Sequence, residues 1–283
     1  MQATKNLKKI QLTDRDDQIL SWLHRDPHLT SQLLKRSRTL PQPFSEVSLL
    51  RRRLRKLRDS GYIKFFTSID GEQYYKLSPQ GYRYLHGLED SASVPDVFEP
   101  MKPLTQLHHF PLLNVVIHLY ADAHRSCLTI KTDLGDRQNS FDFLIGDLIP
   151  DRTLEFVTTG GKVNRVFLEL DNSTETLRTK KDKESWTRKI MMYEQLRDNE
   201  RDPFRVHVVA TKSFIRLQNI LDLAKEVSQR PDRPLFTGSH IATLLAARHP
   251  LVQPWWLAAE GKAVPMVYGQ KTQKKLASAL VAC

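Results

Sequence analysis

The order of apolar segments in the second half of the chain restricts its fold most. An apolar segment of helical length at 104–124 precedes four strand-like runs, at 127–132, 140–151, 152–159 and 165–171. A charged helix at 176–198, a strand at 204–211, a helix at 214–229 and a further segment at 234–250 follow. Short strands that alternate with helices in this way predict an α/β domain around a mixed sheet, in a chain that is α+β overall.

The composition predicts a globular protein with an anionic partner. Of 283 residues, 40% are hydrophobic and 27% are charged, and no apolar run approaches the ~20 residues of a membrane-spanning helix. The chain starts without the apolar segment of a secretory signal, and two cysteines are too few for a disulfide framework, so we expect a cytoplasmic protein without a membrane partner. A formal net charge of +11 makes nucleic acid the first candidate partner.

A proline-containing segment divides the chain. Residues 91–105 hold three prolines, small polar residues and no helical period, which is typical of a linker between domains. We therefore expect one domain at 1–90, a second at 106–260 and a mobile basic tail at 261–283. Most of the positive surplus falls in the first domain, which makes that domain the candidate for DNA binding.

The first domain has the pattern of three amphipathic helices, a β-hairpin and one more helix. The residues that favour helix starts are Thr13, Thr30, Ser45 and Ser78. Asp70-Gly71 favours a type I′ turn between strands rich in aromatic residues. This order resembles a winged helix-turn-helix domain, and KLSPQGYRYL resembles the segment that follows the wing in many such domains. The resemblance implies binding to double-stranded DNA.

The third helix carries leucines on one side and cations on the other. Leu50, Leu54 and Leu57 recur at helical spacing and predict a side packed on the core. The candidate DNA-binding residues are Arg51, Arg52, Arg55, Lys56 and Arg58, of which Arg52, Arg55 and Lys56 lie farthest from the leucines. Such a helix can enter the major groove. The alternatives are a solvated helix face and dimerisation through this domain, which leaves a homodimer open.

Acidic residues mark the ends of two strand-like runs in the second domain. Asp151 follows Ile149-Pro150, and Glu169 and Asp171 end the run after the next turn. Because side chains alternate along a strand, Glu169 and Asp171 share a face, and Asp151 lies beside Glu169 if the two strands form a hairpin. Burying grouped carboxylates without a counter-charge costs several kcal/mol. A hard cation such as Mg²⁺ or Mn²⁺ would remove this cost.

Pro-Asp on one strand and Glu-x on the next resemble the PD-(D/E)xK nuclease fold. In that fold a lysine follows Glu-x on the strand, whereas this chain has Asp171 there. Lys189 on the following helix is the first candidate for the replacement, and Lys180 and Lys183 are the next candidates.

The nuclease resemblance implies roles for the residues of this region. Metal ligands would be Asp151, Glu169 and Asp171, while Lys189 would polarise the attacking water and Tyr193 would supply a supporting hydroxyl or a DNA contact. Each residue also has a structural interpretation: a turn for Asp151, a helix cap near Thr174 for Asp171, an ion pair between Glu169 and Lys189, and core packing for Tyr193.

The combination of these features is similar to the replication-relaxation family of plasmid and mobile-element proteins, near the MOBC-type relaxases. The winged helix pattern, LHHFPLLN, IPD, FLELDNSTET and the helix with Lys189 and Tyr193 carry the similarity, over roughly residues 10–250. It implies a DNA-binding protein that nicks or relaxes DNA by metal-dependent phosphodiester hydrolysis with Mg²⁺ or Mn²⁺. Other plasmid mobilisation or replication proteins would be its partners.

Two alternatives remain at this point. One is a catalytically silent DNA-binding factor that controls replication or transcription, and the other is a resolvase or restriction-like endonuclease of broader specificity. The position of Lys189 separates the first alternative from an active nuclease. A lysine that faces solvent several ångströms from Asp151 and Glu169 favours the silent factor, and a lysine in contact with them favours catalysis.

Overall fold

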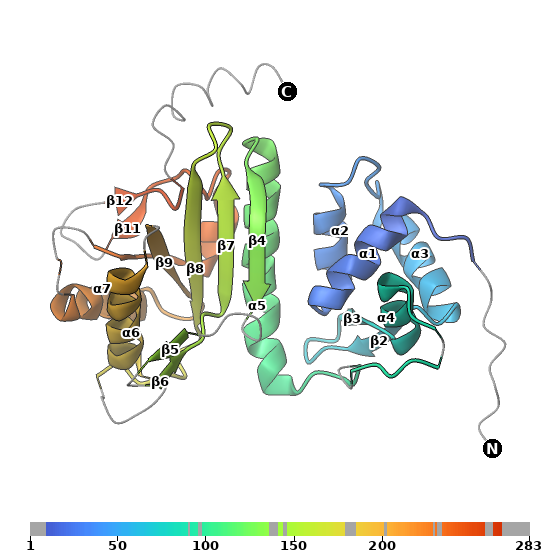
Figure 1. Ribbon diagram of the computed structural model, residues 1–283, viewed down its shortest axis with the longest axis horizontal. Coiled ribbons are helices and arrows are strands. Elements are labelled where there is room, and N and C mark those ends of the chain that lie inside the picture. The colour runs from blue at the N-terminus through green and yellow to red at the C-terminus, as the bar shows by residue number, and fades with distance from the viewer. Residues whose placement is uncertain are drawn as a thin grey trace. The chain divides into compact units, whose positions relative to one another are not determined.

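In the computed structural model, the chain forms two compact units (Figure 1). The described residues are 10–89, 91–95, 98–135, 141–143, 146–178, 185–200, 203–228, 230, 234–257 and 263–267. The units span residues 1–117 and 118–283, so the boundary between them falls inside helix α5 (Pro103–Arg125). The predicted α/β class with a mixed sheet is confirmed.

The amino-terminal unit contains helices and a hairpin in the predicted order. Its elements before α5 are α1 (Asp14–Arg25), β1 (His28–Leu29), α2 (Thr30–Ser37), α3 (Val47–Asp59), β2 (Ile63–Thr67), β3 (Gln73–Leu77) and α4 (Pro79–His86). Strands β2 and β3 form an antiparallel hairpin. Strand β1 pairs with β3 and completes a three-stranded sheet. Leu50, Leu54 and Leu57 of α3 are fully buried in this unit's core, as the leucine spacing predicts.

Local signals set two of the helix starts. The Ser78 side chain accepts a hydrogen bond from the Gly81 backbone N–H at 3.0 Å and caps α4. Thr13 precedes α1, and its backbone N–H donates to the Asp16 carboxylate at 2.8 Å. Both contacts satisfy groups that a helix start leaves open.

The hairpin turn differs from the predicted type I′ turn, which needs positive φ at both central residues. Gly71 has a φ of 81°, whereas the φ of Asp70 is not positive. The Gly71 N–H donates to the Ser68 carbonyl at 3.0 Å. The turn is therefore of type I and is followed by a left-handed glycine, a combination common in longer hairpin loops.

The carboxy-terminal unit is built around a seven-stranded sheet of order β12-β11-β10-β9-β8-β7-β4. Its elements are β4 (Thr129–Gly135), β5 (Phe141–Phe143), β6 (Gly146–Leu148), β7 (Arg152–Val157), β8 (Val163–Asp171), α6 (Trp186–Asn199), β9 (Phe204–Ala210), α7 (Phe214–Val227), β10 (Phe236–His240), α8 (Ile241–Ala246), β11 (Trp255–Leu257) and β12 (Ala263–Val264). The three central strands β8, β9 and β10 are parallel, and β7 forms an antiparallel hairpin with β8. Helices α6 and α7 lie side by side next to the sheet (Figure 1).

The segment between β8 and α6 differs from the predicted helix at 176–198. Helix α6 begins at Trp186, and the described residues 172–178 are irregular, so Asp171 caps no helix at Thr174. The segment returns to the start of α6, because the backbone N–H of Trp186 donates to the Thr176 carbonyl at 3.0 Å. Lys180 and Lys183 lie outside the described residues.

Part of the predicted tail is folded. Strand β12 (Ala263–Val264) pairs with β11, and Met266 and Val267 are buried. The remainder of the predicted tail, residues 261–262 and 268–283, lies outside the described residues. Within the part of the chain that is described, no helix is both long enough and apolar enough to span a membrane.

Candidate functional site

Lys189 lies among acidic side chains at the end of β8. Its Nζ is 2.9 Å from Oε2 of Glu169 and 2.9 Å from Oε1 of Glu175. Asp151 directly precedes Arg152, which pairs with Leu168 across the β7–β8 hairpin. This register places Asp151 beside Glu169. The structure therefore brings together three of the predicted site residues and one glutamate that was not predicted as a site residue.

Tyr193 completes this cluster from one helical turn beyond Lys189. Its hydroxyl donates to Oε1 of Glu169 at 2.5 Å, and both side chains are fully buried. The two oxygens of Glu169 thus accept from different donors on α6, Lys189 on one and Tyr193 on the other. Asp151 is tied to the same strand end, because its Oδ2 accepts the Leu170 backbone N–H at 2.7 Å.

Burial dominates the electrostatics of the cluster. Loss of solvation raises the pKa of Glu169 to about 7, with Asp151 adding to the rise and Lys189 opposing it. Burial likewise raises the pKa of Glu175 and raises the pKa of Tyr193 well above its usual value. For Lys189, burial lowers the pKa, but the carboxylates of Glu169 and Glu175 outweigh it and the pKa is raised. Lys189 is therefore a permanent cation at neutral pH, and Tyr193 is a neutral phenol.

Asp171 belongs to an adjacent cluster, although it shares a strand face with Glu169. Its carboxylate is 1% exposed and binds Arg216 of α7 at two points, with Nε 2.6 Å from Oδ2 and Nη2 2.9 Å from Oδ1. The indole N–H of Trp186 donates to the same carboxylate at 3.1 Å. The counter-charge of Asp171 is thus Arg216.

The oxygen donors around Lys189 fit a hard cation by their chemistry. In the described structure, Oε2 of Glu175 is buried and has no hydrogen-bond partner, which is an unfavourable state for a carboxylate oxygen. Mg²⁺ and Mn²⁺ prefer such oxygen ligands. Among the described residues, however, no three His, Cys, Asp or Glu side chains are already grouped to hold a metal ion. A divalent cation would compete with Lys189 for Glu169 and Glu175.

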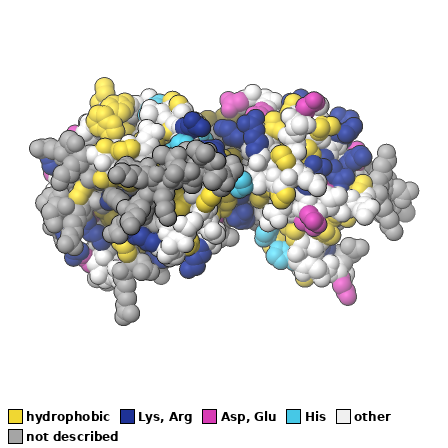
Figure 2. All heavy atoms as spheres, turned by 90° about the horizontal axis from the view of Figure 1, so that it is seen from above, with side chains coloured by type: hydrophobic (Ala, Val, Ile, Leu, Met, Phe, Trp, Pro, Cys, Tyr) yellow, Lys and Arg dark blue, Asp and Glu magenta, His cyan; other side chains and the backbone are white. Residues whose placement is uncertain are grey.

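The predicted DNA-binding residues lie on α3, but they are not equivalent. Arg51, Arg52, Arg55 and Lys56 are exposed, whereas Arg58 forms an ion pair with Asp59 at 2.6 Å. Arg53, within the same basic run, has its Nε 2.6 Å from the fully buried carboxylate of Asp16 and is engaged in the fold. Figure 2 shows groups of lysine and arginine side chains on the surface of this unit.

Sequence reasoning did not assign Glu175 or Arg216 to the site. Glu175 lies in an irregular segment, where no periodicity gives the direction of a side chain, although it is part of the FLELDNSTET stretch that carried the family resemblance. Arg216 is far from Asp171 in sequence and reaches it because β9 lies beside β8 and leads into α7. No local signal indicates that contact.

Comparison with known protein families identifies the family of the chain. A family model described as Replication-relaxation matches residues 20–204, which is more than half of the chain. No curated protein and no solved structure matches the chain.

Proposed function

The chain belongs to the replication-relaxation family, and from this premise we propose that it binds double-stranded DNA and nicks or relaxes it during plasmid or mobile-element replication or mobilisation. The reaction would be metal-dependent hydrolysis of a phosphodiester bond. The observation that carries this proposal is the contact of Lys189 with Glu169, 2.9 Å, beside Asp151. A lysine at the acidic strand end is what the nuclease resemblance requires, and this one comes from α6.

The amino-terminal unit would supply the DNA affinity. Three helices and a hairpin resemble a winged helix, and α3 buries its leucines while Arg51, Arg52, Arg55 and Lys56 face solvent. Exposed guanidinium and ammonium groups bind DNA phosphates by releasing counterions, and arginine also recognises guanine edges in the major groove. This arrangement supports a role for α3 in DNA contact.

The residues around Lys189 would divide the catalytic work. A bound Mg²⁺ or Mn²⁺ would activate water and neutralise the charge that develops on the phosphate. Asp151, Glu169 and Glu175 would hold the cation. Lys189 stays protonated among them and can orient water or stabilise the phosphate by charge, and Tyr193 holds Glu169 in place through its hydroxyl.

Relaxation of supercoiled plasmid tests this proposal. The purified chain is incubated with supercoiled plasmid, with Mn²⁺ or with a chelator, and the topological forms are separated on a gel. We expect open-circular product only with Mn²⁺, and its loss in Glu169→Gln, which keeps the shape and removes the charge. Unchanged plasmid under every condition would refute hydrolysis.

A catalytically silent DNA-binding factor is the second candidate. Both oxygens of Glu169 are occupied by Lys189 and Tyr193, and Asp171 is neutralised by Arg216. These contacts leave an acidic strand end that is stable without a metal ion. Plasmid binding without relaxation in the same assay would identify this function.

A further inference from the structure

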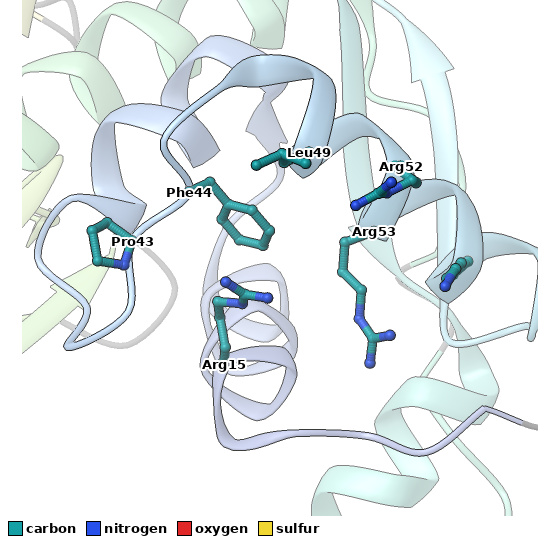
Figure 3. Close-up of a pocket in the computed structure, with 7 residues that line it drawn as sticks. Arg15, Pro43, Phe44, Leu49, Arg52 and Arg53 are labelled. Atoms are coloured by element: carbon teal, nitrogen blue, oxygen red, sulfur yellow. The ribbon is translucent and has the colours of Figure 1, made fainter.

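A pocket opens on the amino-terminal unit between the start of α1 and the side of α3. Figure 3 shows Arg15 of α1 extending toward the Phe44 ring, while Leu49, Arg52 and Arg53 come from α3. The volume is about 270 Å³. Small-molecule sites usually measure about 300–1,000 Å³, so the size suits a single small group.

The charges of the pocket are mostly uncompensated. Arg53 is paired with Asp16, but among the described residues Arg52 and Lys56 have neither a hydrogen-bond nor an ion-pair partner. The Nε atom of Arg15 is buried without a hydrogen-bond partner in the described structure, and its Nη1 has only a long contact of 3.5 Å to the Gln42 carbonyl. Three cations therefore surround one cavity, which favours an anion.

The rest of the lining is apolar and partly aromatic. Pro43, Phe44 and Leu49 line the pocket, and the Arg15 guanidinium carbon lies 4.1 Å from the centre of the Phe44 ring. A guanidinium held against a ring on one face can receive a nucleobase on the other, as in proteins that bind single strands. The pocket thus combines a phosphate-binding edge with a surface for a flat ring.

We propose that this pocket binds one unpaired nucleotide of a DNA strand, with the phosphate near Arg52 and Lys56 and the base near Arg15 and Leu49. The inference rests on the proposed DNA-binding function and adds a substrate class, namely DNA with an unpaired nucleotide. A duplex presents its phosphates to the protein with the bases stacked inside, so it would use the cations and leave the apolar lining empty. Arg52 and Lys56 line the pocket and also belong to the exposed face of α3, so the same cations can contact a duplex and an unpaired nucleotide next to it.

Fluorescence anisotropy with two labelled probes tests this site in the full chain. One probe is a short oligothymidylate and the other is a blunt duplex. Arg15→Gln removes the stacking cation, and we expect it to weaken oligothymidylate binding about tenfold. Leu49→Ser removes apolar contact from a side chain that is 36% exposed, and a loss of about fivefold is expected. Duplex binding should be unchanged in both variants.

Arg25→Gln is the matched control, because it removes one positive charge from the exposed far end of the same helix. It should leave both probes unaffected. Equal losses of affinity for the two probes in Arg15→Gln, or no loss for either probe, would overturn the proposal that the pocket binds an unpaired nucleotide. The proposed DNA-binding function would still stand. Full competition by inorganic phosphate would overturn the assignment to a nucleotide, because phosphate alone would then account for the binding. A parent chain that binds neither probe would instead refute the proposed function itself.

Discussion

Arg216 and Asp171 form a two-point ion pair at the end of β8, with Nε 2.6 Å from Oδ2 and Nη2 2.9 Å from Oδ1. The pair joins α7 to β8, one of the three central strands of the sheet. Because Asp171 is 1% exposed, this guanidinium supplies the charge that allows the carboxylate to be buried.

Arg216→Ala should lower the free energy of unfolding by about 3–5 kcal/mol, because it leaves a buried carboxylate without its counter-charge. Urea unfolding followed by circular dichroism measures this effect. Asp171→Asn keeps an acceptor for the Trp186 indole and removes the charge, so the double variant Arg216→Ala, Asp171→Asn should lose less than the two single variants together. Strict additivity would show that the two residues do not depend on one another.

The sequence predicts well where the chemistry is local. Thr13 and Ser78 mark helix starts, the spacing of Leu50, Leu54 and Leu57 identifies the buried side of α3, and strand alternation places Glu169 and Asp171 on one face. Each of these follows from a period or a cap that extends over a few residues.

Contacts between distant segments were harder to predict. The side chains of Glu169 and Asp171 lie on the same face of β8 but have different partners. Glu169 pairs with Lys189 of α6, and Asp171 pairs with Arg216 of α7. The spacing of residues along β8 contains no information about which helix packs over each position. The same reason explains why Arg53, one of six cations in a run, is an internal partner of Asp16.

Alanine at Arg52, Arg55 and Lys56 together should weaken duplex binding and change the slope of log K against log salt by about two to three units, since fewer counterions are released. These side chains are exposed, so the melting temperature should stay near that of the parent. Filter binding across a salt series gives the slope. An unaltered slope would show that these three side chains of α3 do not contact DNA phosphates.

Arg53→Ala should behave in the opposite way. Asp16 is fully buried and its carboxylate binds Arg53, so loss of the guanidinium should cost about 1–3 kcal/mol of stability. The salt slope of DNA binding should remain that of the parent. Thermal unfolding measured beside the same salt series checks both results, and a changed slope with normal stability would place Arg53 on the DNA-binding face.

Stability should fall as the pH rises from about 5 to about 8, by an amount on the order of 1–3 kcal/mol. Burial raises the pKa of Glu169 to about 7, so this group stabilises the fold fully below its ordinary pKa and loses that contribution as the pH passes through about 7. The pKa of Glu175 is raised in the same direction. Urea titrations across this range should show a weaker pH dependence in Glu169→Gln, and parallel curves for parent and variant would contradict the assignment.

Tyr193 and Lys189 should have unequal effects on DNA cleavage, and the reason is the charge of each group. Burial and the neighbouring carboxylates keep Tyr193 neutral, with its hydroxyl donated to Glu169, and a neutral buried phenol is a poor nucleophile. Lys189 supplies the positive charge between Glu169 and Glu175. We therefore expect Tyr193→Phe to keep substantial Mn²⁺-dependent plasmid relaxation and Lys189→Ala to lose most of it. Water as the nucleophile also leaves no covalent link, so labelled DNA should separate from denatured protein on a gel. A labelled adduct that vanishes in Tyr193→Phe would assign the attack to the tyrosine.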